Sequence, residues 1–100
     1  MARYEVHRSD GNAREIIDAM RKYGASVEII DRPVDVLVGF RGVTAIAEIK
    51  TPRGKLKASQ KAFLEGWRGL SRVLRSVDEG IELLEDMRWM AGAIEELCPF

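Results

Sequence analysis

The chain has 100 residues, no net formal charge, 46% apolar residues and 32% charged residues. This composition predicts one globular domain over residues 1–100 and excludes a low-complexity chain. No apolar run approaches the roughly 20 residues of a membrane span and no signal-peptide core is visible, so we expect a cytoplasmic protein without a membrane partner. Single copies of cysteine (Cys98) and histidine (His7) exclude an internal disulfide, cysteine-based zinc sites and histidine-based metal sites or triads.

The first predicted elements are a helix and a short strand. Asn12 is a candidate N-cap for a helix over Ala13–Tyr23, whose apolar residues recur at helical spacing and which Gly24 is expected to end. Ser26–Ile30 follows as a strand. Asp31-Arg32-Pro33 then interrupts the chain, because proline has no amide hydrogen for a strand ladder.

The next predicted element is a hairpin of two apolar strands, Val34–Phe40 and Val43–Lys50, joined at Arg41-Gly42. Glycine at the second turn position is a recognised hairpin signal. A two-residue loop determines the register of the strands. The expected pairs are Phe40–Val43, Gly39–Thr44, Val38–Ala45, Leu37–Ile46, Val36–Ala47 and Asp35–Glu48.

Three charged residues gather at the open end of this hairpin. Asp35 is expected opposite Glu48, and Lys50 shares the face of Glu48 because strand side chains alternate. Two opposed carboxylates are destabilising without a cation, and a hard ion such as Mg²⁺ (or Mn²⁺) prefers oxygen ligands. The arrangement is typical of a catalytic site, although each residue taken singly is also compatible with an ordinary charge at a strand end.

A second helix is predicted over about Leu56–Leu70, after a loop at Thr51–Gly54. Gln60 falls on the apolar stripe of this helix and therefore needs a polar partner, for which the charged end of the hairpin is a candidate. A helix-edge amide in water fits the periodicity equally well. The apolar stripe consists of Leu56, Phe63, Leu64, Trp67 and Leu70.

The last predicted elements are a strand over Ser71–Ser76 and helical residues over Asp78–Met87 and Arg88–Leu97, with Gly92 as a candidate break and Pro99 as the end. The order α-β-β-β-α-β-α predicts an α/β fold. In this fold helices cover a mixed central sheet, and the hairpin strands form the middle of that sheet.

The charges are distributed unevenly along the chain. Residues 50–75 contain eight basic residues and one acidic residue, whereas residues 76–100 contain seven acidic residues and one basic residue. Such asymmetry favours a surface for a polyanion such as nucleic acid. A helix with solvated lysines is the alternative interpretation.

Several motifs together resemble a known family. Pro33-Val34-Asp35 followed by Glu48-Ile49-Lys50 resembles the core motif of the PD-(D/E)XK nuclease superfamily, and among its members the chain resembles the stand-alone VRR-NUC nucleases and the archaeal Holliday-junction resolvases. Asn12…Glu15-Ile16 resembles the helix motif of this family, and Leu56…Gln60…Trp67 resembles its post-motif helix. The likeness covers about residues 8–84, and residues 85–100 form an acidic helical extension. The resemblance implies a restriction-endonuclease-like fold.

The resemblance also implies an activity, namely metal-dependent phosphodiester hydrolysis by a DNA endonuclease selective for branched or junction DNA. Asp35, Glu48 and the carbonyl of Ile49 would hold one or two Mg²⁺ (or Mn²⁺) ions, and Lys50 would orient or deprotonate the attacking water. Gln60 would position Lys50 or a phosphate oxygen. Glu15 is the candidate for the carboxylate of the family's first helix.

The resemblance to nucleases also implies that the protein has binding partners. A homodimer is expected because 100 residues offer little surface for a four-way junction; no small-molecule cofactor is expected. Two alternatives stay open, a nucleic-acid-binding module without catalysis and an interaction domain whose acidic C-terminal helices meet a basic partner. The residues expected to contact the nucleic acid are Asn12, Arg53, Lys55, Lys57 and Lys61.

Overall fold

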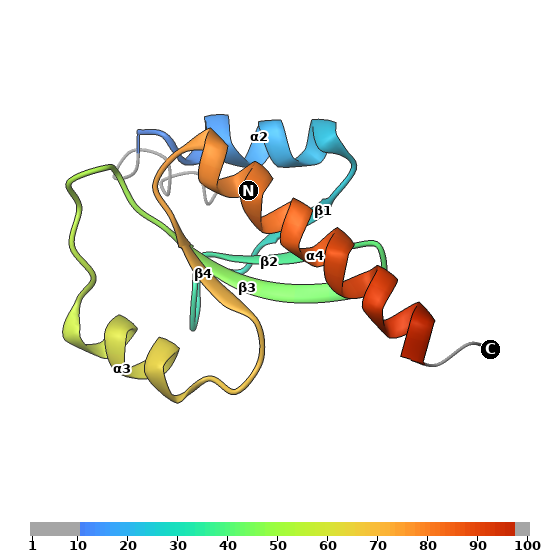
Figure 1. The fold of residues 1–100 in the computed structure, drawn as a ribbon. Helices are drawn as coiled ribbons and strands as arrows, with labels where there is room; N and C mark the ends of the chain where they lie inside the picture. The colour runs from blue at the N-terminus through green and yellow to red at the C-terminus, as the bar shows by residue number, and fades with distance from the viewer. Residues whose placement is uncertain (1–10, 98–100) are drawn as a thin grey trace.

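A four-stranded sheet forms the centre of the fold, with helices on both of its faces (Figure 1). The structure is a computed structural model that describes residues 11–97. In the sheet, neighbouring strands follow the order β1-β2-β3-β4; the first two pairs are antiparallel and β4 is parallel to β3. The elements are α2 (Ala13–Tyr23), β1 (Ser26–Ile29), β2 (Val36–Phe40), β3 (Val43–Ile49), α3 (Ala58–Gly66), β4 (Ser71–Leu74) and α4 (Val77–Leu97).

The predicted α/β arrangement is confirmed, including the order of elements and the central position of the hairpin strands β2 and β3. Five of the six predicted pairs, from Phe40–Val43 to Val36–Ala47, are present. The sixth, Asp35–Glu48, is not a strand pair, because β2 begins at Val36. Arg41 (φ 54°) and Gly42 (φ 85°) form the turn. Two positive φ values in succession match the twist of a two-residue hairpin, so the turn determines the register as expected.

Most element boundaries differ modestly from the prediction. The helix predicted over residues 56–70 is limited to Ala58–Gly66, because the flanking residues Lys57 and Trp67 are extended. The final helix is continuous from Val77 to Leu97, so a break at Gly92 is wrong. One glycine costs a helix only about 1 kcal/mol, which the rest of a long helix offsets. The predicted start of the family likeness near residue 8 and the predicted helix end at Pro99 lie outside the described residues.

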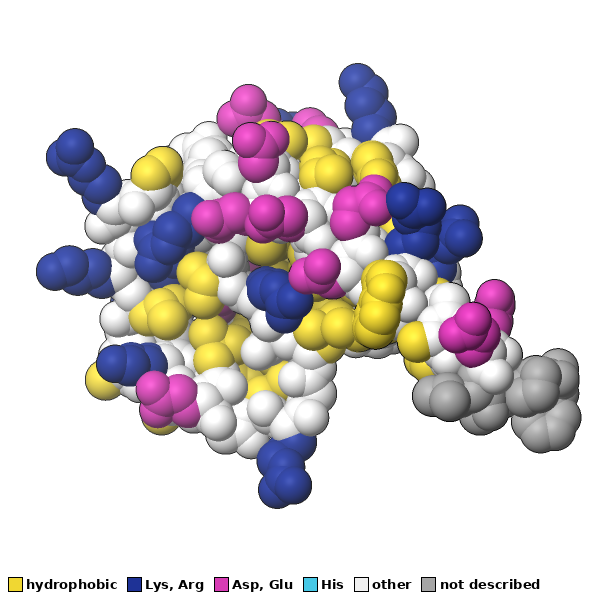
Figure 2. Space-filling model, in the orientation of Figure 1, with side chains coloured by type: hydrophobic (Ala, Val, Ile, Leu, Met, Phe, Trp, Pro, Cys, Tyr) yellow, Lys and Arg dark blue, Asp and Glu magenta, His cyan; other side chains and the backbone are white. Residues whose placement is uncertain are grey.

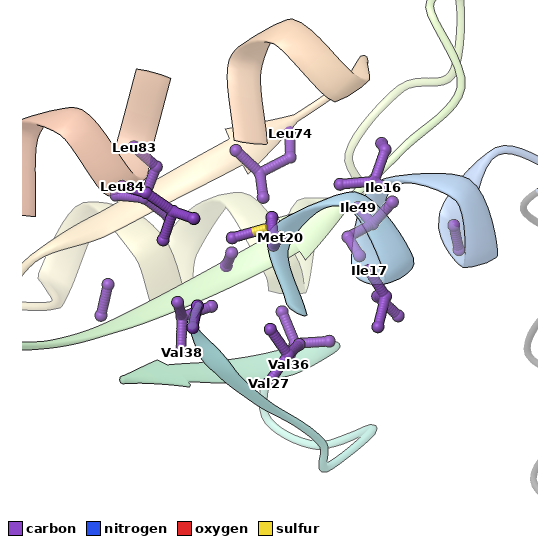
Figure 3. Packing of buried hydrophobic residues seen from close by; sticks show 14 of the residues in the cluster. Ile16, Ile17, Met20, Val27, Val36, Val38, Ile49, Leu74, Leu83 and Leu84 are labelled. Atoms are coloured by element: carbon purple, nitrogen blue, oxygen red, sulfur yellow. The ribbon is translucent and has the colours of Figure 1, made fainter. Parts of the chain in front are cut away.

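The main core lies between the sheet and the pair α2 and α4 (Figure 3). In β2, Val36 and Val38 point into this core, while Leu37 between them points to the other face and is 38% exposed. Strand β3 is buried on both faces over residues 45–49. Helix α3 lies on the side of the sheet away from α2 and α4, set off from the strands (Figure 1), and has no fully buried residue. The second face is therefore covered less completely than the first.

Basic and acidic side chains are partly separated on the surface of the protein. Figure 2 shows several Lys and Arg side chains at the left, near the segment between β3 and α3, and Asp and Glu side chains across the middle, where α4 lies; further Lys and Arg side chains lie at the centre and at the right. Over the described part of the chain, no helix is both long enough and apolar enough to cross a membrane.

Two glycines of α4 offer a matched test of the packing between the helices. A Cβ at Gly80 would lie 3.1 Å from Met20 Cγ and 3.2 Å from Ile16 Cγ2, both in α2, whereas a Cβ at Gly92 would meet nothing within 4 Å. We expect Gly80→Leu to lower the free energy of unfolding by about 1–3 kcal/mol through overpacking. Gly92→Leu should raise it by up to about 1 kcal/mol through helix propensity. Urea denaturation measures both, and equal effects would contradict the close contact.

Candidate active site

The open end of the hairpin brings the two predicted carboxylates together. Asp35 lies one residue beyond the last strand pair, Val36–Ala47. Its carbonyl accepts hydrogen bonds from the amides of Ile30 (2.9 Å) and Asp31 (3.2 Å). Its carboxylate Oδ2 accepts a bond from the Ile49 amide at 2.7 Å. The backbone of Asp35 is therefore anchored to the residues that follow β1, and its side chain is anchored to β3.

Glu48 is the one charged residue that is buried within residues 11–97, with 2% of its surface exposed. Its burial, the negative charge of Asp35 and a hydrogen bond with the Asp35 carboxyl group raise the pKa of Glu48 from 4.5 to about 7, and Lys50 offsets only part of this rise. Without a cation, the Glu48 carboxyl group therefore keeps its proton to a higher pH than an ordinary carboxyl group. A carboxyl pair with one buried member favours binding of a cation.

Lys50 and Gln60 complete the cluster from two different elements. Lys50 Nζ lies 4.0 Å from Glu48 Oε2, and its side chain is only 15% exposed. Gln60 Nε2, in the first turn of α3, donates to the same Glu48 oxygen at 2.6 Å, while Gln60 Oε1 accepts a bond from the Lys57 amide at 2.8 Å. The polar partner expected for Gln60 is therefore the charged end of the hairpin. The contact is with Glu48, and the expected role of Gln60 in positioning Lys50 or a phosphate oxygen stays a prediction.

These side chains open onto a surface pocket of about 370 Å³. Lys55 and Lys57, which precede α3, extend the wall of the pocket and are exposed. Arg53 and Lys61 are exposed nearby in the sequence but do not line the pocket. The lining residues are Asp35, Glu48, Lys50, Thr51, Gly54, Lys55, Lys57 and Gln60.

The donor set suits a hard divalent ion. Asp35 and Glu48 provide carboxylate oxygens, and no sulfur or imidazole ligand from residues 11–97 lines the pocket. Ile49, whose carbonyl was also expected as a ligand, is not among the lining residues. Among residues 11–97 no group of three or more His, Cys, Asp or Glu side chains lies together as a metal cage. Mg²⁺ typically uses one or two carboxylates and keeps several waters, so the smaller set fits this ion.

The remaining two predicted residues lie elsewhere. Glu15 is exposed on α2 and lines a separate pocket of about 330 Å³, together with Asn12, Asp78 and others. Asn12 occupies the N-cap position of α2, but its side chain does not cap that helix. Its Nδ2 donates instead to the carbonyls of Lys50 (3.2 Å) and Arg75 (3.0 Å). The catalytic role of Glu15 and the nucleic-acid contact of Asn12 stay predictions, and the structure does not bring Glu15 to the carboxyl pair.

One residue beside the pocket was missed by the sequence reasoning. Arg75 Nη1 donates to the carbonyls of Thr51 (2.9 Å) and Gly54 (2.6 Å), which both line the pocket. These bonds span more than 20 residues and end on backbone atoms. Backbone acceptors are the same for every residue type, so no sequence pattern could have indicated the contact.

Comparisons of the chain with protein-family models, with curated proteins and with solved structures find no match.

Proposed function

We propose that the protein is a metal-dependent DNA endonuclease with a restriction-endonuclease-like fold, as its PD-(D/E)XK-like motifs suggest. One observation carries the proposal: two carboxyl groups and a lysine share one pocket, and the pKa of the buried Glu48 is raised to about 7 in part by Asp35. A structural ion pair would instead stabilise the charged form of the acid. A carboxyl pair with a nearby lysine is the arrangement expected of a site that recruits a cation to act on an anionic substrate.

The cation would be held by Asp35, Glu48 and the Ile49 carbonyl. When bound, Mg²⁺ supplies a Lewis acid for the phosphate charge and lowers the pKa of water. Lys50 is placed to donate a hydrogen bond to a phosphate oxygen, or to accept a proton from the attacking water after losing its own. Gln60 holds Glu48 Oε2 in a single orientation from α3.

The substrate would be held by its backbone. Lys55 and Lys57 line the pocket, and Arg53 and Lys61 are exposed on the same segment and the following helix. Long basic side chains of this kind contact phosphates without reading bases, so binding should depend strongly on salt and on DNA shape. We propose branched or flap-like DNA as the target and a homodimer as the active form.

The direct test is cleavage of labelled four-way-junction and flap DNA in the presence of Mg²⁺ or Mn²⁺, with EDTA as the metal-free control. We expect products only with the ion, and none from Asp35→Ala or Glu48→Ala proteins whose folding is confirmed by circular dichroism. Equal cleavage by wild type and both variants would refute the assignment of the site.

A second function is favoured by the position of Glu15. Because this carboxylate lines a different pocket, the described part of the chain gives the site two carboxylates, and a site of this kind is also compatible with binding nucleic acid without cutting it. This alternative predicts salt-sensitive DNA binding of equal strength with and without Mg²⁺, and no products in the cleavage assay.

A further inference from the structure

The segment from Thr51 to Lys57, between β3 and α3, forms one wall of the pocket without regular secondary structure. Thr51, Gly54, Lys55 and Lys57 all contribute to that wall. A connecting segment of this kind is usually more mobile than the elements it joins. The position of this segment relative to Asp35 and Glu48 therefore depends on the contacts that other residues make with it.

Arg75 is the side chain that holds this segment. Its Nη1 donates to the carbonyls of both Thr51 and Gly54, and the Gly54 amide donates to the same Thr51 carbonyl at 3.0 Å. The two ends of a tight turn are thus joined to each other and to one guanidinium group. Such a planar group directs several N–H donors in a rigid geometry, which lysine cannot reproduce.

Arg75 is itself fixed by three rigid elements. It follows the last residue of β4, its amide donates to Glu79 Oε1 of α4 at 2.7 Å, and its carbonyl accepts the bond from Asn12 at the start of α2. Asn12 Nδ2 also donates a hydrogen bond to the Lys50 carbonyl, and the Lys50 amide donates to the Leu74 carbonyl at 3.0 Å. The segment is therefore held relative to the sheet that carries Glu48.

We propose that Arg75 is a positioning residue, which keeps the Thr51–Lys57 segment in the one conformation that presents Lys55 and Lys57 to a phosphate at the pocket. It touches no reacting group and acts on the substrate only through the segment. The part of this proposal that concerns DNA rests on the proposed nuclease function. A segment held in its binding conformation avoids the entropy cost of ordering when the substrate binds.

The first test needs no substrate. Limited trypsin digestion compares wild type, Arg75→Ala and Arg72→Ala; Arg72 is the matched control, because it lies on β4 and pairs with Asp86 at the surface. We expect cleavage after Arg53, Lys55 and Lys57 to be about tenfold faster in Arg75→Ala than in the other two proteins, since two charge-assisted hydrogen bonds are lost. Arg75→Lys should be intermediate.

Two results of the digestion would overturn the proposal. Equal rates in Arg75→Ala and Arg72→Ala would mean that the guanidinium group does not hold the segment. Fast cleavage distributed over the whole chain in Arg75→Ala would mean that the residue maintains the global fold instead, because trypsin then acts on the unfolded state.

The second test concerns DNA. In steady-state cleavage of the junction substrate, Arg75→Ala should raise KM about tenfold and leave kcat within about twofold of wild type, because the segment contributes to binding rather than to the chemical step. A loosened segment with an unchanged KM would overturn the role in DNA binding. A wild-type protein that cuts nothing would refute the nuclease function alone, and the digestion result would still decide whether Arg75 holds the segment.

Discussion

Lys50→Met should lower the rate of Mg²⁺-dependent DNA cleavage by about 10²–10⁴-fold while leaving the protein folded. Methionine keeps most of the aliphatic length of lysine but removes the charge and all donors. The Lys50 ammonium lies 4.0 Å from Glu48 Oε2, at the limit of an ion pair, so it contributes little to the fold. Its loss should therefore appear in kcat rather than in stability. Single-turnover cleavage with saturating enzyme measures the effect.

Lys22→Met is the control for this prediction. Lys22 is exposed at the end of α2, outside the residues that line the pocket, and its replacement changes the net charge of the protein by the same amount. Its cleavage rate should stay within about twofold of wild type at moderate salt, where distant surface charges are screened. If both methionine variants lose the same activity, only the total charge matters, and Lys50 has no chemical role.

The stability of the metal-free protein should fall as the pH rises from about 4.5 to about 7, by up to about 3 kcal/mol from Glu48 alone. The folded state raises the pKa of Glu48 above its ordinary value of 4.5, so in this pH range the folded protein binds more protons than the unfolded chain. The stabilisation is complete below pH 4.5 and is lost as the pH passes through 7. Glu48→Gln, which is permanently neutral, should not show this loss.

Urea denaturation in EDTA between pH 4.5 and 8 measures this prediction as the difference in unfolding free energy between Glu48→Gln and wild type. The difference should grow in favour of the variant as the pH rises. Glu28→Gln is the control, because it removes the same kind of carboxyl group at an exposed position on β1, and the pH-dependent difference should be larger for Glu48→Gln. A flat profile for Glu48→Gln would mean that Glu48 titrates normally.

Addition of Mg²⁺ extends this measurement without an activity assay. A bound cation stabilises the ionised carboxyl pair, so millimolar Mg²⁺ should raise the melting temperature of the wild type more at pH 8 than at pH 5. Glu48→Gln should show little shift at either pH. An equal rise of the melting temperature in both proteins would mean that the ion binds at another site.

The site was predictable from the sequence wherever it depended on local geometry. The alternation of side chains along two strands and a two-residue turn brought Asp35, Glu48 and Lys50 to one end of one face, and the register followed from Arg41-Gly42. These rules act between residues that are close in the hairpin. The helix boundaries at Tyr23 and Gly24 were predictable for the same reason, since a left-handed glycine ends a helix locally.

Contacts between layers could not be read from the chain in this way. Periodicity indicated that Gln60 needed a polar partner, but only the position of the first turn of α3 near β3 in the fold shows that this partner is Glu48. Glu15 lies in a different pocket because the rotation of α2 on the sheet is set by its buried residues Ile16, Ile17 and Met20. The bonds from Arg75 end on backbone carbonyls, which carry no residue-specific signal.

Residue patterns alone thus established the strands, the turn and the neighbouring acids, because backbone geometry repeats every two residues in a strand and every 3.6 residues in a helix. The positions of the helices in the fold determined which residues line the pocket and which residue Gln60 contacts. They also determined the hydrogen bonds from Arg75 to the Thr51–Lys57 segment. Docking depends on how side chains distant in the sequence fill shared volume, and that packing is a property of the assembled fold.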